Sequence, residues 1–214
     1  MFEIGPVKIS WLGHAAFRVR DSAVIYVDPY EISGGEEADL ILVTHDHFDH
    51  CSPEDAAKVA HPGTKILGPP SCLKKLGSVP GEKIEISPGR EVEVAGVKVR
   101  AVPAYNVRPE RRKFHPRDKG YVGYVFELDG VRIYHAGDTD FIPEMADLEV
   151  DVALLPVSGT YVMDAEEAAR AAAALRPRVA IPMHYGSIVG SERDARRFAE
   201  LVEGCEVVIL EPED

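Results

Sequence analysis

Residues 40–53 of the chain read LILVTHDHFDHCSP. The first four residues form a continuous apolar run of strand length, which is typical of a strand that is covered on both faces. Ser52 suits a helix N-cap and Pro53 suits the first helical position. The polar residues from Thr44 to Cys51 are therefore predicted to lie in a loop that joins a buried strand to a helix.

This loop carries four potential metal ligands. Neutral imidazole nitrogens and carboxylates are ligands that zinc, iron, nickel and manganese accept. In an extended backbone His45, His47 and Asp49 point the same way, because side chains alternate between two faces. His50 would point away, so the loop must curl there if all four converge. One pair would then serve one ion and the Asp-His pair a second; the alternative is a solvated polar turn.

Two later segments also place polar residues directly after a predicted strand. Asp138 follows the strand 131–134, in the stretch His135-Ala136-Gly137-Asp138-Thr139-Asp140, and His184 follows the strand 179–181. Either residue alone is more typical of a structural turn. Because the carboxyl ends of strands are where sites of α/β proteins gather, we expect both residues to join the four-residue cluster.

The pattern elsewhere predicts a β-rich first part and an α/β last part. The further strands are predicted at 7–11, 15–20, 23–27, 91–94, 97–102, 121–128, 131–135, 152–155 and 207–210. Further helices are predicted after the cap Asp164 and over 191–202. No linker or repeat interrupts this pattern, so we expect one domain over residues 1–214, with helices outside two sheets.

Charge and cysteine usage restrict the partners. The net charge is −12, from 36 acidic and 24 basic side chains, and should repel phosphate backbones. We therefore expect a small-molecule substrate and no nucleic acid. No apolar run has the length of a membrane span, and the N-terminus lacks the features of a signal peptide. Cys51, Cys72 and Cys205 show no paired spacing, which favours reduced thiols and a cytoplasmic location. The oligomeric state stays open.

The order of the motifs carries a resemblance to a known family. H-x-H-x-D-H, then G-D-T-D, then a late P-M-H resembles the metallo-β-lactamase superfamily over nearly the whole chain. The segments 11–15 and 27–29 look like its N-terminal strands. In detail the chain is most similar to the small subgroup related to ascorbate-6-phosphate lactonase and N-acyl-phosphatidylethanolamine phospholipase D. The resemblance implies an α/β (α+β) fold, a four-layer αββα sandwich with metals at one edge.

The resemblance also implies a ligand set. His45 and His47 would hold the first metal, and Asp138 would bridge the two metals. The second metal would be held by Asp49, His50 and His184. Asp28 would be a buried aspartate that orders the backbone of the metal loop.

One departure from the family pattern concerns the first metal. Relatives usually supply a third histidine after a P-A-x-H-like strand end, where this chain has Pro103-Ala104-Tyr105-Asn106. The carbonyl of Asn106 is a weak ligand compared with imidazole. His115 could reach back and take the role; otherwise the first site is weak or empty. His14 is a second candidate near the metals, where contact with the substrate or with a metal-bound group is favoured over ligation.

The implied chemistry is metal-assisted hydrolysis. One or two divalent ions, zinc first with manganese, iron or nickel as alternatives, would activate a water. Asp49 would orient that water, and the leaving group would be protonated by a metal-bound water, His14 or His115. The bond class stays open among phosphoesters, lactones and other esters, amides and thioesters. The alternatives are a non-catalytic metal-stabilised binding protein and a redox protein on the same fold.

A basic loop raises the question of substrate charge. Six cations lie within twelve residues of this acidic chain, namely Arg108, Arg111, Arg112, Lys113, Arg117 and Lys119. Arginine forks suit phosphate and carboxylate groups, so an anionic, for example phosphorylated, substrate is one hypothesis. The alternative is a solvated loop without a ligand.

Overall fold

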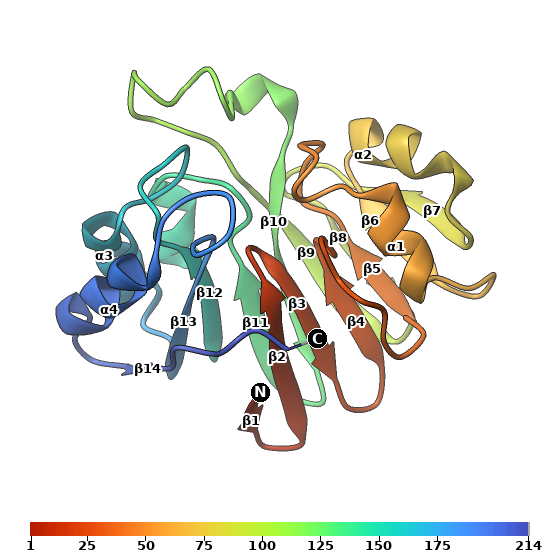
Figure 1. Ribbon diagram of the computed structural model, residues 1–214, viewed down its shortest axis with the longest axis horizontal. Helices are drawn as coiled ribbons and strands as arrows, with labels where there is room; N and C mark the ends of the chain where they lie inside the picture. The colour runs from red at the N-terminus through yellow and green to blue at the C-terminus, as the bar shows by residue number, and fades with distance from the viewer. Residues whose placement is uncertain (214) are drawn as a thin grey trace.

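Two seven-stranded sheets face each other, and helices cover their outer sides (Figure 1). The computed structural model describes residues 1–213. The first sheet consists of β1 (Phe2–Ile4), β2 (Val7–Gly13), β3 (Ala16–Arg20), β4 (Val24–Val27), β5 (Leu40–Leu42), β6 (Lys65–Gly68) and β7 (Glu82–Glu85). The second sheet consists of β8 (Glu91–Val94), β9 (Val97–Pro103), β10 (Val122–Leu128), β11 (Val131–His135), β12 (Val152–Pro156), β13 (Val179–Met183) and β14 (Glu206–Val207). This arrangement is the αββα sandwich that the sequence predicted.

Four α-helices form the outer layers. They are α1 (Pro53–Val59), α2 (Pro70–Lys75), α3 (Ala165–Leu175) and α4 (Glu192–Leu201), and three short 3₁₀ turns are η1 (Leu76–Ser78), η2 (Arg117–Lys119) and η3 (Pro143–Asp147). The predicted caps are present: Ser52 accepts from the N–H of Asp55, and Asp164 forms a capping box with Glu167. Such caps satisfy backbone N–H groups that the first helical turn leaves unpaired. They fix where α1 and α3 begin, directly after site loops.

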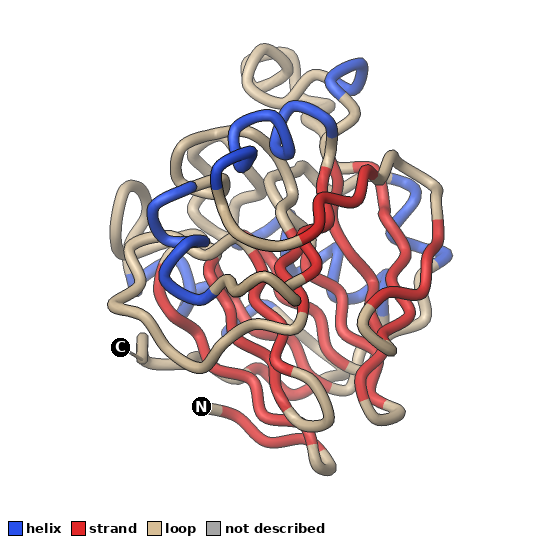
Figure 2. The backbone as a smooth tube through the Cα atoms, turned by 90° about the vertical axis from the view of Figure 1, so that its right-hand side faces the viewer, coloured by secondary structure: helices blue, strands red, loops and turns tan. Residues whose placement is uncertain are grey.

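Each sheet repeats the same pattern of strand directions. β1 to β4 are antiparallel and β4 to β7 parallel, while β8 to β11 are antiparallel and β11 to β14 parallel. As a result β2, β4 and β5 run one way in the first sheet, and β9, β11 and β13 run one way in the second. Their carboxyl ends lead into the longer loops, which gather at the upper end of the strands in Figure 2. This edge of the sandwich holds the site.

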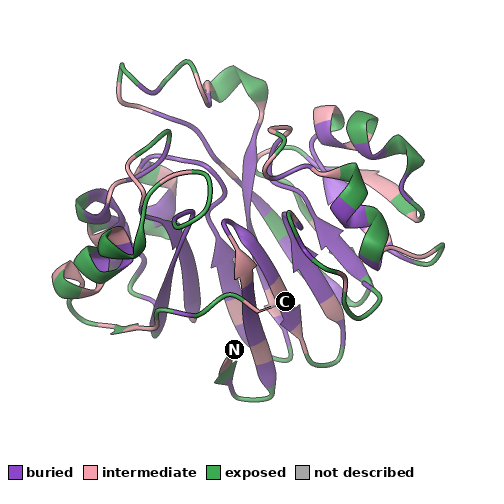
Figure 3. Ribbon diagram, in the orientation of Figure 1, coloured by how far each residue is buried: buried purple, intermediate pink, exposed green. Residues whose placement is uncertain are grey.

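Strand β5 shows how the core positions the metal loop. Leu40 and Leu42 pack in the core between the sheets, and Ile41 and Val43 pack in the second core beneath α1 and α2. All four are buried, which confirms a strand covered on both faces (Figure 3). Each buried aliphatic side chain contributes about 2 kcal/mol of transfer free energy, so the strand is a rigid base for the residues that follow.

The structure adds elements that the sequence pattern did not indicate. The sequence pattern did not predict β1, β6, β7 and α2. The helix α2 was missed because Gly68-Pro69-Pro70 reads as a turn, and β7 was missed because Glu82–Glu85 is mostly charged. The strand predicted over 207–210 is wrong beyond Val207. After the bond from Val208 N to Ala180 O the chain leaves the second sheet, and Glu213 N reaches the Trp11 carbonyl in the first sheet.

Candidate metal centre

Apart from His115, which lies in the long loop between β9 and β10, the residues of the predicted cluster follow the ends of strands. His14 follows β2, Asp28 follows β4, and His45 follows β5 in the first sheet. In the second sheet Asp138 follows β11 and His184 follows β13. His14, Asp28 and His184 adopt left-handed backbone conformations with φ of 49°, 45° and 62°, which Asp and His tolerate better than most side chains. The strand ends of both sheets therefore converge on one site.

Asp28 fixes the start of the metal loop. Its Oδ1 accepts from the N–H of Thr44 at 2.8 Å, and its Oδ2 accepts from the Thr44 hydroxyl at 2.6 Å and from His50 Nδ1 at 2.8 Å. The loop then turns tightly, because the N–H groups of His50 and Cys51 both donate to the His47 carbonyl. This is the curl that brings His50 to the same side as the other three residues.

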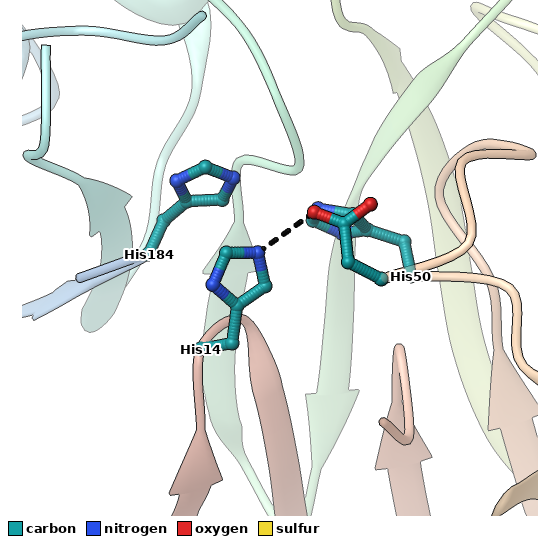
Figure 4. A group of neighbouring side chains, drawn as sticks. His14, His50 and His184 are labelled. Carbon is teal, nitrogen blue, oxygen red and sulfur yellow. Dashed lines mark hydrogen bonds and ion pairs between the residues drawn. The ribbon is translucent and has the colours of Figure 1, made fainter. Parts of the chain in front are cut away.

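The potential ligands form two groups of four, and a third, overlapping group joins Asp28 with His45 and His50. One group contains His45, His47, His115 and Asp138, and the other contains His14, Asp49, His50 and His184. Within each group the ligand atoms lie within 4.8 Å of one another. Figure 4 shows His14 and His184 approaching His50 from different elements. All seven predicted ligands thus fall into the two groups, with His14 as an eighth member.

Asp138 lies between the two groups. Its Oδ2 is 3.3 Å from His115 Nε2 and 3.8 Å from His45 Nε2 in the first group. The same oxygen is 3.2 Å from His184 Nε2, and Oδ1 is 3.2 Å from His50 Nε2, in the second group. A carboxylate in this position can contact an ion on either side.

Four histidines are oriented by hydrogen bonds on the ring nitrogen away from the site. The Nδ1 partners are Thr44 Oγ1 for His45 (2.9 Å), Asp28 Oδ2 for His50 (2.8 Å), Asn106 Oδ1 for His115 (2.8 Å) and Ser158 Oγ for His184 (3.2 Å). The Thr44 hydroxyl donates to Asp28, so it accepts from His45. An acceptor at Nδ1 fixes one proton there and directs Nε2 into the site, which is the nitrogen that a metal-binding histidine would offer to an ion.

The donor set fits divalent metal ions. Among residues 1–213, His50 Nε2, His184 Nε2 and Asp138 Oδ1 are buried atoms without a hydrogen-bond partner. Unpaired buried polar atoms are costly and rare in proteins, so three of them aimed at one another point to a ligand. Imidazole and carboxylate groups are the ligands that zinc and neighbouring first-row metals accept.

The electrostatics of the cluster keep its carboxylates ionised. Burial alone would raise the pKa of Asp49, but the hydrogen bond with His14 and the charge of His50 lower it to about 2. Burial would lower the pKa of His50, but Asp138 and Asp28 raise it to about 10. Burial and the neighbouring His50 hold the pKa of His45 well below its usual value. The site thus combines ionised carboxylates with a neutral imidazole at His45.

Asn106 occupies a different role from the histidine that it replaces. Its Oδ1 orients His115, and its Nδ2 donates to Asp140 Oδ1 at 3.0 Å and to the Tyr161 carbonyl. The N–H of Asn106 also donates to the His115 carbonyl at 2.8 Å, which closes the loop between them. His115 Nε2 therefore lies with His45, His47 and Asp138 in the first group. The sequence did not indicate Asp140 or Ser158 as supports, because their partners lie far along the chain.

Three of the six cations of the basic loop pair with carboxylates. Arg111 is buried against Asp140 and Glu167, Arg108 pairs with Asp164 and Glu167, and Arg117 pairs with Glu144. Arg112 donates to the Val107 carbonyl and Lys113 lies over the Phe114 ring, so the anionic substrate stays a prediction that the arginine pairs do not support. Burying Arg111 is possible only because those carboxylates compensate its charge.

A cleft of about 550 Å³ opens onto the cluster. Its floor contains five of the potential ligands, namely His47, Asp49, His115, Asp138 and His184. Apolar and aromatic side chains, together with Asp46 and Lys75, form the rest of its lining. A pocket with a few convergent polar groups and perturbed pKa values is a typical active site.

Comparison with known proteins agrees with this geometry. Residues 8–184 match the model of a family described as the Beta-lactamase superfamily domain. The chain belongs to this superfamily. Because the ligand cluster lies at one edge of an αββα sandwich, the metallo-β-lactamase resemblance is confirmed, whereas the closer relationship to the lactonase and phospholipase subgroup stays a prediction.

Several members of the superfamily are similar over almost their full length. A UPF0173 metal-dependent hydrolase of Thermococcus onnurineus is 37% identical, over 96% of this chain and 97% of the relative. A crystal structure from Parabacteroides distasonis superposes with a TM-score of 0.86 and 35% identity, over 97% of this chain and 94% of the other. A novel metallo hydrolase from Ignicoccus hospitalis superposes with a TM-score of 0.76 and 28% identity, over 97% and 96%. The chain is therefore a member of a family of metal-dependent hydrolases.

Proposed function

We propose that the protein hydrolyses a small substrate at a two-metal centre. The observation that carries the proposal is the pair of four-residue ligand groups that share Asp138 as a neighbour. His45, His47 and His115 would hold one ion, and Asp49, His50 and His184 would hold the other. The histidine-rich set favours zinc, with manganese, iron and nickel as alternatives.

The ions supply Lewis-acid chemistry when bound: they polarise the scissile group and make hydroxide available from water at neutral pH. The chain's own residues position the reactants. Asp49 Oδ2 and His14 Nε2 lie 3.0 Å apart, so His14 fixes the carboxylate that orients the attacking water. We assign protonation of the leaving group to this pair rather than to His115, because both nitrogens of His115 are engaged.

Metal analysis and a hydrolysis assay test this function together. The purified protein should hold about two metal ions per chain and hydrolyse at least one member of a panel of esters, lactones, thioesters and phosphodiesters. His47→Ala should lower the rate by at least about 100-fold, since it removes a ligand that faces the cleft. His61→Ala is the matched control, because His61 lies outside both ligand groups.

Two results would reject the enzyme. Protein without stoichiometric metal would remove the basis of the mechanism, and so would full hydrolysis by His47→Ala. Metal without hydrolysis of any bond class would support the alternative of a metal-stabilised binding protein.

The substrate's charge and the protein's location remain proposals. Since Arg108, Arg111 and Arg117 are paired with carboxylates, an anionic substrate has no support from these three arginines, and the panel should contain neutral and anionic members of each bond class. Three free cysteines and the acidic net charge support a cytoplasmic enzyme without a nucleic-acid partner.

A further inference from the structure

Exposed apolar side chains gather around the mouth of the cleft. Among residues 1–213 the exposed large hydrophobic side chains are Met1, Phe48, Tyr161, Ile188 and Ile209. Three of these, Phe48 at 65%, Tyr161 at 42% and Ile188 at 42% exposure, line the cleft over the metal cluster. Contiguous exposed apolar surface on a soluble protein usually marks a binding site. The grouping of three exposed apolar side chains at the mouth of the cleft therefore indicates an apolar ligand.

The rim is built from loops of both sheets. Phe48 lies in the metal loop after β5 and meets Tyr30 edge to face, with centroids 5.9 Å apart at 77°. Phe114 comes from the loop after β9 and packs against Tyr161, with centroids 4.4 Å apart at 60°. Ile188 lies in the loop between β13 and α4. Two aromatic walls and an aliphatic wall thus surround the polar floor.

The cleft offers little to a charged substrate arm. Within residues 1–213, Lys75 is the one lysine in its lining, no arginine lines it, and the Lys75 ammonium donates to the Asp46 carbonyl. Lys113, next to the wall residue Phe114, lies over that ring with Nζ 4.9 Å from the centroid. Asp46 and Asp49 add negative charge to the same lining. Burying an anionic group against apolar walls without a partner costs more than the contact returns. The anchoring site for polar groups is therefore the floor and not the rim.

We infer that the substrate is an uncharged small molecule with an aromatic arm, which the Phe48, Phe114, Tyr161 and Ile188 side chains bind while the scissile group lies on the metal cluster. This inference rests on the proposed function for the position of the scissile group. Aromatic rings suit the walls, because edge-to-face contacts between rings add to the apolar area that they bury.

Binding of hydroxamates tests the inference without requiring turnover. Acetohydroxamate and benzohydroxamate present the same chelating group to a metal and differ by one phenyl ring. Calorimetry on the metal-loaded protein should show that benzohydroxamate binds at least about tenfold more tightly, since burial of a ring is worth that ratio or more. 4-Carboxybenzohydroxamate, with a charge at the far end of the ring, should lose most of this gain.

Two isoleucines provide a matched pair of variants. Ile188→Ala should reduce the preference for benzohydroxamate by about threefold to tenfold, because it removes one wall of the cleft. Ile209→Ala should leave the preference unchanged, since Ile209 is similarly exposed, at 39%, but lies outside this cleft. Phe48→Ala repeats the test on an aromatic wall.

The outcomes separate the inference from the proposed function. Equal affinity for the two hydroxamates, or tighter binding of the carboxylated probe, overturns the inference while metal binding and hydrolysis stand. A strong preference for benzohydroxamate, lost in Ile188→Ala, supports the inference even if no ester of the panel is hydrolysed. Absence of metal and of binding by either probe overturns both.

Discussion

Asn106 stands where the family pattern suggested a histidine, and it forms a hydrogen bond with His115. Asn106 Oδ1 accepts from His115 Nδ1, and this contact directs His115 Nε2 toward His47 and Asp138. The amide oxygen is a weak metal ligand but a good acceptor for an imidazole N–H. Asn106 therefore orients the His115 ring through the nitrogen that faces away from the site.

Asn106→Ala tests this role. Without the acceptor, the His115 ring loses the contact that fixes its proton on Nδ1, so we expect metal affinity of the first site to fall by about 10–100-fold. Titration with a competing chelator measures this change. The second site provides an internal control, because none of its residues contacts Asn106. Equal weakening of both sites, or of neither, would contradict the role.

The sequence predicted the site residues that lie in one segment, 45–50, more firmly than those that come from distant segments, such as His115. His45, His47, Asp49 and His50 lie in one segment, so residue type was enough to predict a cluster, although strand periodicity pointed His50 away and the turn at His47 brings it back. His115 was open, because its position depends on how the loop after β9 folds back. That fold depends on Asp140, which receives bonds from Asn106 and from the N–H groups of Val107 and Arg108.

At the scale of elements, ion pairs connect the basic loop to the N-terminal end of α3. Arg111 reaches Asp140 Oδ1 at 2.9 Å and also pairs with Glu167, which is 56 residues further along the chain. Such a partner cannot be found from sequence spacing, which is why the cluster of cations suggested a ligand. The structure shows an interior ion pair that holds the loop carrying His115.

Arg111→Met should destabilise the fold by about 3–5 kcal/mol, because it leaves the buried Asp140 without a cationic partner and Glu167 with Arg108 alone. Chemical denaturation of the apoprotein measures the loss. Lys119→Met is the control from the same loop, exposed in the structure, and should change stability by less than about 0.5 kcal/mol. Similar stability of the two variants would show that the Arg111 network does not hold the loop.

The element pattern was otherwise well predicted where periodicity is clear. The strand 131–135 has the bounds that its sequence indicated, and the caps of α1 and α3 lie at Ser52 and Asp164. Short polar strands such as β7 escape prediction, because their pairing with a neighbour, and not their own composition, makes them strands.

At the scale of the whole molecule, the metal centre joins the two halves of the sandwich. Its candidate ligands come from the first sheet through His45, His47, Asp49 and His50, and from the second sheet through His115, Asp138 and His184. The buried core between the sheets also packs side chains of both halves together. Within residues 1–213, none of the helices has the length and apolarity needed to cross a bilayer.

Removal of metal should lower the thermal stability of the whole chain. A ligand present at about 1,000 times its Kd adds about 4 kcal/mol to the folded state. For a chain of this size that corresponds to a decrease in Tm of about 10 °C after chelation. Scanning calorimetry with and without chelator measures it. His45→Ala should melt at the lower temperature and respond less to chelator; identical Tm values of the untreated and chelated protein would contradict the prediction.

Asp28 has a consequence for how the protein acquires its ions. One carboxylate holds Thr44 and His50, and through Thr44 it orients His45, using only bonds within the chain. We therefore expect the fold, and not a bound ion, to set the geometry of these candidate ligands. Ions should therefore enter, leave and exchange in the native protein without refolding, and the metal found in a preparation should follow the supply during growth. The fold should set the geometry of the site, and the metals available during growth should determine which ion is bound.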